Sequence, residues 1–227
     1  FSGAGTGYDE PKVTVSCDTD TFTVTSNGIT SYPFVKKTPA GLKSQNFSWT
    51  ISTKPAVAAA TTSIETKMSA VAFTVTGLPI YGPLEGPTPT AEAYGDPVYN
   101  ELLDTCGGHT GYNADYHNHQ VFAIAACSLE ETIVGYALDG FPIYSNPSYK
   151  WKSGYEKTGN PKSYSFKAYT YTGGTNALDK CNGQTQADGS YRYYITESFP
   201  YVIGCYTGTF KKQTGIAAQA INMDHHK

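Results

Sequence analysis

The sequence predicts a mainly β fold with few short helices. The 227-residue chain is rich in tyrosine, glycine and proline, with 19, 23 and 13 copies, and it has only 2 methionines. Aromatic residues favour strands, and glycine and proline favour turns. Several segments alternate apolar and polar side chains, as a strand with one buried face does, and no stretch keeps a helical period over three turns. A chain of this length can bury a full core.

Each expected element follows from its local pattern. Alternating apolar residues, such as Val13 and Val15, predict strands, and Gly, Pro, Asn and Asp clusters predict the turns between them. The expected elements, in order, are a hairpin over 11–25 that turns at Asp18-Thr19-Asp20, a strand over 44–52, a strand over 70–82, a short helix within 93–106, a buried strand over 121–127, a strand and turn over 132–145 and a proline-broken strand pair over 190–208.

Composition excludes several classes of partner. Charged residues make up only 15% of the chain, and the formal net charge is −3. This argues against nucleic acid and against an anionic membrane surface, both of which attract basic proteins. No apolar run approaches the roughly 18 residues of a membrane span. We therefore expect neither nucleic acid nor a membrane as a partner.

Three features predict a secreted protein. The first residues, FSGAGTGYDE, contain neither an initiator methionine nor an apolar signal core, and resemble a mature end left by signal-peptide removal. Asn46 begins the sequence Asn-Phe-Ser, a glycosylation acceptor. The chain also has five cysteines, which in this context indicate an oxidising compartment.

The chain contains an internal repeat. Residues 103–119 align without a gap on residues 178–194, and six of the 17 positions are identical, where average usage predicts about one. A second pair precedes them, GLPIY at 77–81 and GFPIY at 140–144. We therefore expect two related β-rich halves, approximately residues 70–127 and 132–208, packed as one sandwich-like domain over residues 1–227.

The two copies differ in their histidines. His109 aligns with Gln184, His117 with Arg192 and His119 with Tyr194, so the first copy holds three of the five histidines of the chain and the second copy holds none. The shared residues are those that could build a scaffold. Because the histidines are confined to one copy, we interpret them as functional.

Strand geometry predicts that these histidines converge. Side chains at i and i+2 of a strand point to one face, so His117 and His119 project together, and His109 lies across a glycine-rich turn from them. Converging imidazoles suit copper, zinc, iron or nickel. Cys106, three residues before His109, is the nearest thiol and a further candidate ligand. Zinc would accept three histidines and a water, and copper would also accept two histidines and a cysteine thiolate, so the residues alone leave the metal open.

The odd number of cysteines leaves two pairings open. If Cys106 binds the metal, the other four cysteines can form two disulfides. If each half closes its own loop, the bridges are Cys106–Cys127 and Cys181–Cys205, and Cys17 is free. The second pairing respects the repeat.

These motifs together resemble the YHYH-domain family of secreted proteins, over roughly residues 13–208. The matching pieces are VTSNGI, SQNFSWTIS, GLPIYGP, LDTCGGH, YHNH, VGYALDGFPIY, LDKCNG and FPYVIGCYTG. The family motif stands here as Tyr116-His117-Asn118-His119. Relatives often carry a histidine where this chain has Tyr191-Arg192-Tyr193-Tyr194, and tend to have Pro-Asn-His where it has Thr30-Ser31-Tyr32. These departures leave the first-copy histidines as the candidate site.

The resemblance implies a secreted copper protein and, for some relatives, a copper-dependent oxidase that converts formate to carbon dioxide and reduces oxygen to hydrogen peroxide. The substrate would then be a small carboxylate, and the peroxide could serve other extracellular redox enzymes. Arg192 is a candidate for binding the carboxylate bidentately. Tyr116 is a candidate redox residue, with packing as its alternative role.

Two other functions remain open. A copper-binding or electron-transfer protein without its own turnover would favour a closed site of two histidines and a cysteine. A structural or carbohydrate-binding module with a zinc or calcium site would need no redox metal. His225 and His226, near the end of the chain, are assigned no role.

Overall fold

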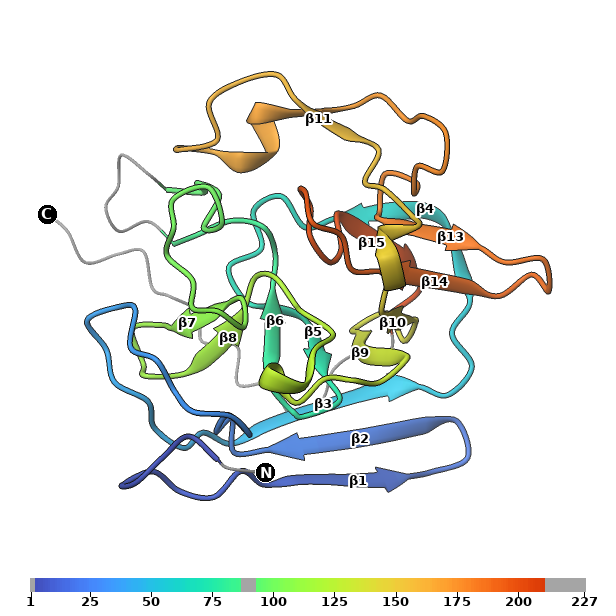
Figure 1. Ribbon diagram of the computed structural model, residues 1–227. Helices are drawn as coiled ribbons and strands as arrows, with labels where there is room; N and C mark the ends of the chain where they lie inside the picture. Colours follow the sequence, from blue (N-terminus) through green and yellow to red (C-terminus); the bar gives the residue numbers. More distant parts are fainter. Residues whose placement is uncertain (1–2, 87–92, 211–227) are drawn as a thin grey trace, which may run out of the picture.

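The computed structural model describes residues 3–86 and 93–210 (Figure 1). Within these residues the chain forms strands and three short 3-10 helices, which confirms the mainly β prediction. The strands are β1 (Val13–Cys17), β2 (Thr21–Ser26), β3 (Phe47–Ser52), β4 (Val57–Ser63), β5 (Ala70–Thr74), β6 (Pro79–Tyr81), β7 (Gly108–Thr110), β8 (Tyr116–Asn118), β9 (Ile133–Ala137), β10 (Pro142–Tyr144), β11 (Tyr155–Lys157), β12 (Tyr169–Tyr171), β13 (Gly183–Thr185), β14 (Tyr191–Tyr194) and β15 (Cys205–Gly208). The 3-10 helices are η2 (Ala125–Cys127), η3 (Pro147–Tyr149) and η4 (Ser165–Ala168).

An antiparallel three-stranded sheet, β1-β2-β3, precedes the repeat. Its first two strands form the hairpin predicted from the sequence, with residues 18–20 between them. β3 alternates as predicted, because Trp49 and Ile51 are buried and their neighbours are less so. Trp49 stacks on Phe73 of β5 at a centroid distance of 4.9 Å, which packs this sheet against the main one.

The main sheet has eight strands in the order β13-β14-β10-β9-β5-β6-β8-β7. β5 and β9 pair antiparallel at its centre, and each half then continues outward in the same way. One half has an antiparallel β5–β6 pair, a parallel β6–β8 pair and an antiparallel β8–β7 hairpin. The other half repeats this with β9–β10, β10–β14 and β14–β13. The two copies of the sequence repeat therefore lie at opposite ends of one sheet.

Each copy builds its hairpin on one aspartate. In the first copy, Asp104 Oδ1 accepts hydrogen bonds from the main-chain N–H groups of Cys106 and Gly108, and Asp104 Oδ2 accepts one from the Tyr116 hydroxyl at 2.8 Å. The carboxylate thus ties the turn before the hairpin to its second strand.

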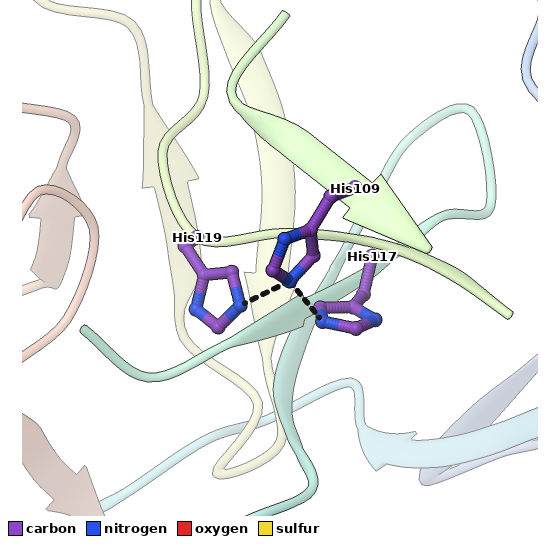
Figure 2. A group of neighbouring side chains, drawn as sticks. All are labelled: His109, His117 and His119. Atoms are coloured by element: carbon purple, nitrogen blue, oxygen red, sulfur yellow. Dashed lines mark hydrogen bonds between the residues drawn. The ribbon is translucent and has the colours of Figure 1, made fainter. Parts of the chain in front are cut away.

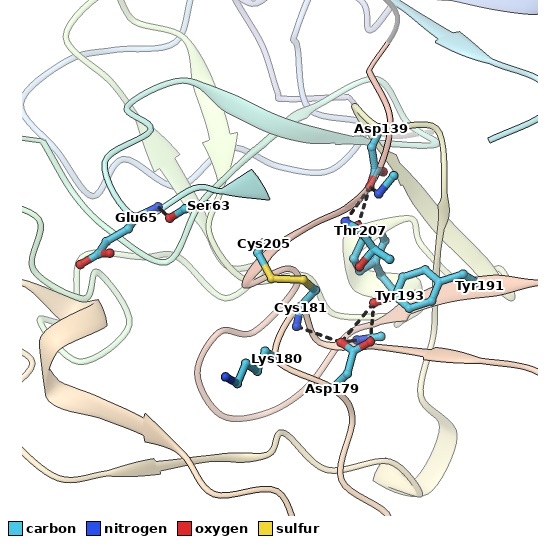
Figure 3. Close-up of a disulfide and its surroundings, with 12 residues drawn as sticks. Ser63, Glu65, Asp139, Asp179, Lys180, Cys181, Tyr191, Tyr193, Cys205 and Thr207 are labelled. Atoms are coloured by element: carbon cyan, nitrogen blue, oxygen red, sulfur yellow. Dashed lines mark hydrogen bonds between the residues drawn. A yellow bond between two sulfur atoms is a disulfide. The ribbon is translucent and has the colours of Figure 1, made fainter. Parts of the chain in front are cut away.

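The second copy repeats these contacts (Figure 3). Asp179 Oδ1 accepts from the N–H groups of Cys181 and Gly183, and the Tyr191 hydroxyl lies 2.9 Å from Asp179 Oδ2. The shared residues of the repeat are therefore the ones that fix its hairpins.

Two disulfides close the loops of the two copies. They join Cys106 to Cys127 and Cys181 to Cys205, and Cys17 is free and exposed. This is the second of the pairings that the sequence left open.

Three expected elements are wrong. The single strand expected over 70–82 is two antiparallel strands, β5 and β6, joined by a turn. Residues 121–127 form no strand: their last three residues are η2, and Ile124 is 49% exposed. The expected helix within residues 93–106 is a series of turns, such as Asn100 N–H to Asp96 O at 2.9 Å. Neither the apolar composition of 121–127 nor the turn residues of 93–106 show which side chains face solvent, so the sequence could not assign their secondary structure.

Two buried clusters form the core. The larger one joins the three-stranded sheet to the centre and second half of the main sheet, with Trp49, Phe73 and Tyr193 among its members. The smaller one lies beneath the β7–β8 hairpin and contains Tyr32 and Tyr116. No helix in residues 3–86 and 93–210 is long and apolar enough to cross a membrane.

Candidate metal centre

Three histidines meet beside the β7–β8 hairpin. His109 of β7 and His117 of β8 are directly opposed in the antiparallel register, and His119 follows β8. As the strand period predicts, His117 and His119 project to one side of the hairpin. Tyr116 and Asn118 project to the other, where they bond Asp104 and the Cys106 carbonyl.

The rings point their Nε2 atoms at one another (Figure 2). His109 Nε2 lies 3.1 Å from His117 Nε2 and 3.3 Å from His119 Nε2. One ligand atom from each of the three residues can be chosen so that all lie within 4.8 Å. Ligands held at about 2.0–2.1 Å from a shared ion in a tetrahedral arrangement are about 3.3–3.4 Å apart. The cluster therefore has the dimensions of a metal centre and can hold a metal ion.

The main chain fixes the tautomer of each ring. The Nδ1 atoms of the three histidines lie 3.2, 3.3 and 2.7 Å from the carbonyl oxygens of Leu102, Asp115 and Gly82 respectively. A carbonyl oxygen only accepts, so each Nδ1 carries the hydrogen. In a neutral ring Nε2 then holds the lone pair, and the lone pairs of three rings face one point.

All three rings are buried, and burial favours the neutral form of His119. His109, His117 and His119 are 2%, 3% and 1% exposed. Desolvation by burial lowers the pKa of His119 to about 3, against the opposing effect of the nearby Glu85 carboxylate. Neutral imidazole is the form that binds transition metals.

Tyr81 and Asp115 support His117. The Tyr81 ring stacks on the His117 ring at a centroid distance of 4.0 Å and an interplanar angle of 15°. Asp115 Oδ2 lies 3.5 Å from His117 Nδ1. Burial by itself raises the pKa of Asp115, but its contact with His117 outweighs this and lowers it overall. These contacts fix the plane of the ring from two directions.

A carboxylate that the sequence reasoning missed also reaches the cluster. Glu85 follows β6, and its Oε2 lies 3.0 Å from His109 Nε2 and 3.7 Å from His119 Nε2. Burial raises the pKa of Glu85, whereas a hydrogen bond from His109 and the positive charge of His109 and His119, when those rings are protonated, lower it below its usual range. One signal could have found it: aligning GLPIY with GFPIY sets Glu85 against Ser148, so Glu85 also occurs only in the first copy.

One of the comparisons with known proteins found a match. Residues 48–208, more than half of the chain, match the family described as YHYH protein. The chain belongs to the YHYH family. No curated protein and no solved structure matches it. Both hairpins of the repeat and the whole histidine cluster lie inside the YHYH region.

Cys106 is not a ligand of this YHYH centre. Its sulfur is bonded to Cys127, so it offers no thiolate to a metal. The residue instead anchors the turn before β7, where its N–H donates to Asp104 and its carbonyl accepts from Asn118. The prediction of Cys106 as a metal ligand is therefore wrong.

Arg192 does not lie with the histidines. It belongs to β14, five strand positions from β8 in the main sheet, or roughly 24 Å at about 4.8 Å per strand. Its guanidinium lies over the Tyr144 ring, 4.4 Å from the centroid, beside an open pocket of about 470 Å³. The related halves do not fold onto each other, so Arg192 cannot reach a substrate at the histidines.

Tyr116 lies next to the centre but faces away from it. The side chain is fully buried, and its hydroxyl bonds Asp104 and lies 3.1 Å from the Tyr32 hydroxyl. Desolvation raises the pKa of Tyr116 well above its usual value. The structure places it as a packing and anchoring residue of the YHYH motif rather than as a group that contacts substrate. His225 and His226 lie outside the described residues.

Proposed function

We propose that this chain is a secreted copper-dependent oxidoreductase whose metal is held by His109, His117 and His119. One observation carries the proposal: three buried Nε2 atoms converge while all three Nδ1 atoms face carbonyl oxygens. Three histidine ligands are characteristic of metal sites that keep a position for water or substrate, whereas structural zinc sites are usually closed by cysteines.

The donor set favours copper among the candidates. Calcium prefers oxygen ligands, so three imidazoles argue against a calcium module. A copper site for electron transfer usually includes a cysteine thiolate, and the nearest cysteine is in a disulfide. Copper forms the most stable complexes of the divalent first-row metals with nitrogen ligands. Zinc is the alternative that metal analysis must exclude.

The proposed reaction is the oxidation of formate, which the resemblance to copper-dependent formate oxidases suggests. Formate and a proton react with dioxygen to give carbon dioxide and hydrogen peroxide. The C–H bond of formate breaks, two electrons pass from carbon to dioxygen, and the peroxide gains the two protons. Bound copper would supply a redox couple and a positive charge for the carboxylate.

The residues of the chain hold this chemistry in place. The carbonyls of Gly82, Leu102 and Asp115 fix the rings, so the nitrogens need no rearrangement when a metal binds. Burial of the rings keeps water from their lone pairs. Because Arg192 is remote, recognition of the carboxylate falls to the metal centre itself.

Secretion is part of the same proposal. The chain carries two disulfides, which form and persist in oxidising compartments. Asn46, the glycosylation acceptor, is exposed. Peroxide formed outside the cell would be available to other extracellular redox enzymes, and neither nucleic acid nor membrane is expected as a partner.

The test begins with metal content. We expect about one copper per chain after copper loading and dialysis, measured by mass spectrometry, and its loss in the His117→Ala/His119→Ala double variant. The matched control is Arg192→Ala/Tyr194→Ala, at the positions that correspond to His117 and His119 in the second copy. Formate should then yield peroxide in equal amounts to carbon dioxide. Zinc alone, or copper without peroxide from formate, would contradict the proposal.

A further inference from the structure

The carboxylate of Glu85 faces the same point as the three imidazoles. We propose that Glu85 is the fourth protein ligand of the metal centre, which makes the set three histidines and one carboxylate. Substrate would then occupy a fifth position, because catalytic sites of this kind can expand to five ligands. This inference rests on the metal site of the proposed function and goes beyond it, because neither the histidine cluster nor the family motif contains Glu85.

Distance supports a ligand role. Glu85 Oε2 is 3.0 Å from His109 Nε2. The Nε2 atoms of His117 and His119 are slightly farther from His109 Nε2, at 3.1 and 3.3 Å. Its separation of 3.7 Å from His119 Nε2 lies near the spacing of about 3.3–3.4 Å expected for ligands that share one ion in a tetrahedral arrangement. Carboxylate oxygens bind zinc at about 2.0–2.2 Å, close to the distance for imidazole.

The oxygen that faces the cluster has no other use. Glu85 Oε2 is buried at the atomic level and has no hydrogen-bond partner, whereas Oε1 accepts from the Gly86 N–H at 2.7 Å. Because His109 Nδ1 donates to the Leu102 carbonyl, a neutral His109 presents a lone pair to Oε2. Two lone pairs at this distance repel each other unless a cation lies beside them.

The backbone holds Glu85 in this position. Its N–H donates to the Gly95 carbonyl at 2.8 Å, and its own carbonyl accepts from the Tyr94 N–H at 3.0 Å. Both main-chain polar groups of Glu85 are thus bonded to the segment at residues 94–95. The carboxylate is therefore preorganised by both its backbone and Oε1.

Glu85 is also the most exposed of the four side chains. Its side chain is 23% exposed, against 3% for His109 and 1% for His119. The carboxylate therefore lies on the side of the centre nearest solvent. Small ligands that reach the metal would approach past it.

A carboxylate ligand sets a charge preference. Three neutral imidazoles and one carboxylate bring a single negative charge, which stabilises Cu²⁺ more than Cu⁺. Replacing Glu85 by glutamine keeps the size of the side chain and removes this charge. We therefore expect Glu85→Gln to weaken binding of Cu²⁺ much more than binding of Cu⁺.

The competing arrangement is an ion pair. If His109 carried a proton on both nitrogens, its Nε2–H would donate to Glu85 and no metal would be needed at that contact. The ion pair and the ligand predict different results for Glu85→Gln, because only the ligand changes the environment of a bound metal.

The experiment uses Cu²⁺, Cu⁺ and Co²⁺ as probes of the full chain. We would compare wild type, Glu85→Gln and the control Glu131→Gln, whose side chain is exposed. Affinities come from competition with chelators, and ligand identity from the electron paramagnetic resonance of Cu²⁺ and the visible absorption of Co²⁺. Circular dichroism establishes that each variant folds.

We expect Glu85→Gln to lower the Cu²⁺ affinity by roughly 100-fold or more. Loss of a group that only orients a ligand costs less, about 10–100-fold. Both spectra should change, and the control should match wild type. Unchanged spectra and affinity in Glu85→Gln would overturn the ligand role and leave the copper proposal standing. If wild type binds Co²⁺ but not copper, and Glu85→Gln binds Co²⁺ more weakly, the ligand role would stand and the copper proposal would be overturned. A wild type that binds neither metal would overturn both.

Discussion

At the scale of single residues, the main chain rather than side chains holds the three histidine tautomers. The acceptors are the carbonyls of Gly82, Leu102 and Asp115. A point substitution changes a side chain but leaves a carbonyl in place. The plane of the His117 ring is also supported by side chains, those of Tyr81 and Asp115.

We therefore expect Tyr81→Ala to lower metal affinity by about 10–100-fold, because His117 loses the ring that fixes its plane. Tyr81→Phe is the matched control: it keeps the stacked ring and removes only the long 3.4 Å contact of the hydroxyl with Asp115. Chelator competition measures both affinities. An equal loss in the two variants would assign the effect to the hydroxyl instead of the ring.

Residue-scale prediction from sequence succeeded where spacing decides geometry. The i, i+2 rule placed His117 and His119 on one face, and the glycine-rich turn returned His109 to them. Glu85 was missed because it reaches the cluster from the segment after β6, and no short-range period relates that segment to β8. Cys106 was misassigned because proximity in sequence to His109 does not reveal that its sulfur is bonded to Cys127.

At the scale of elements, the two hairpins of the repeat share one close contact. A Cβ on Gly108 would overlap the Tyr116 hydroxyl and the His117 carbonyl. A Cβ on Gly183 would overlap the Tyr191 hydroxyl and the Arg192 carbonyl. Each hairpin can close over its tyrosine only because the opposite strand begins with glycine.

The glycines offer a matched pair of variants. We expect Gly108→Ala and Gly183→Ala each to destabilise the metal-free protein by about 1–3 kcal/mol, the usual cost of overpacking. Only Gly108→Ala should lose metal affinity, because only its hairpin carries the histidines. Chemical denaturation and metal titration separate the two effects. Equal loss of affinity in Gly183→Ala would mean that the hairpins are not independent.

The first disulfide should matter for stability and not for metal binding. It spans a sequence separation of 21, and loss of a loop of that size costs about 3 kcal/mol in the chain-entropy account. We expect Cys106→Ser/Cys127→Ser to unfold more easily and still retain one metal ion per chain. The corresponding Cys181→Ser/Cys205→Ser variant is the control. A folded first variant without metal would restore Cys106 as a ligand.

Element prediction succeeded for strands with one buried face and failed elsewhere. Residues 44–52 alternate, and β3 buries Trp49 and Ile51 as expected. Residues 121–127 form an apolar run without alternation, and the run is partly exposed because it crosses the surface to deliver Cys127 to its disulfide. Hydrophobicity alone did not distinguish a buried strand from a surface segment whose last residue, Cys127, is held by a disulfide.

At the scale of the whole molecule, the halves of the repeat join edge to edge through β5 and β9. This arrangement sends the two equivalent hairpins to opposite ends of the sheet (Figure 1). The repeat was visible in the sequence, but the order of the strands was not. Arg192 could therefore be aligned with His117 but could not be placed near it or far from it.

The sheet order makes a clear prediction for Arg192. We expect Arg192→Ala to leave metal affinity and the Michaelis constant for formate unchanged, because the residue lies five strand positions from β8. Loss of its contact with the Tyr144 ring should cost about 0.5–1 kcal/mol of stability. Steady-state kinetics and thermal unfolding measure the two effects. A raised Michaelis constant would show that the pocket beside Arg192 takes part in the reaction.

The second hairpin has the same backbone arrangement as the first but lacks the metal-binding side chains. Gln184 and Arg192 oppose each other across β13 and β14 in the register that joins His109 to His117. Tyr194 holds the position of His119, and Ser148 that of Glu85. Introducing three histidines and a glutamate at these four positions would test whether the shared backbone is sufficient to form a second metal-binding site. The second hairpin is thus a natural scaffold for designing a metal site.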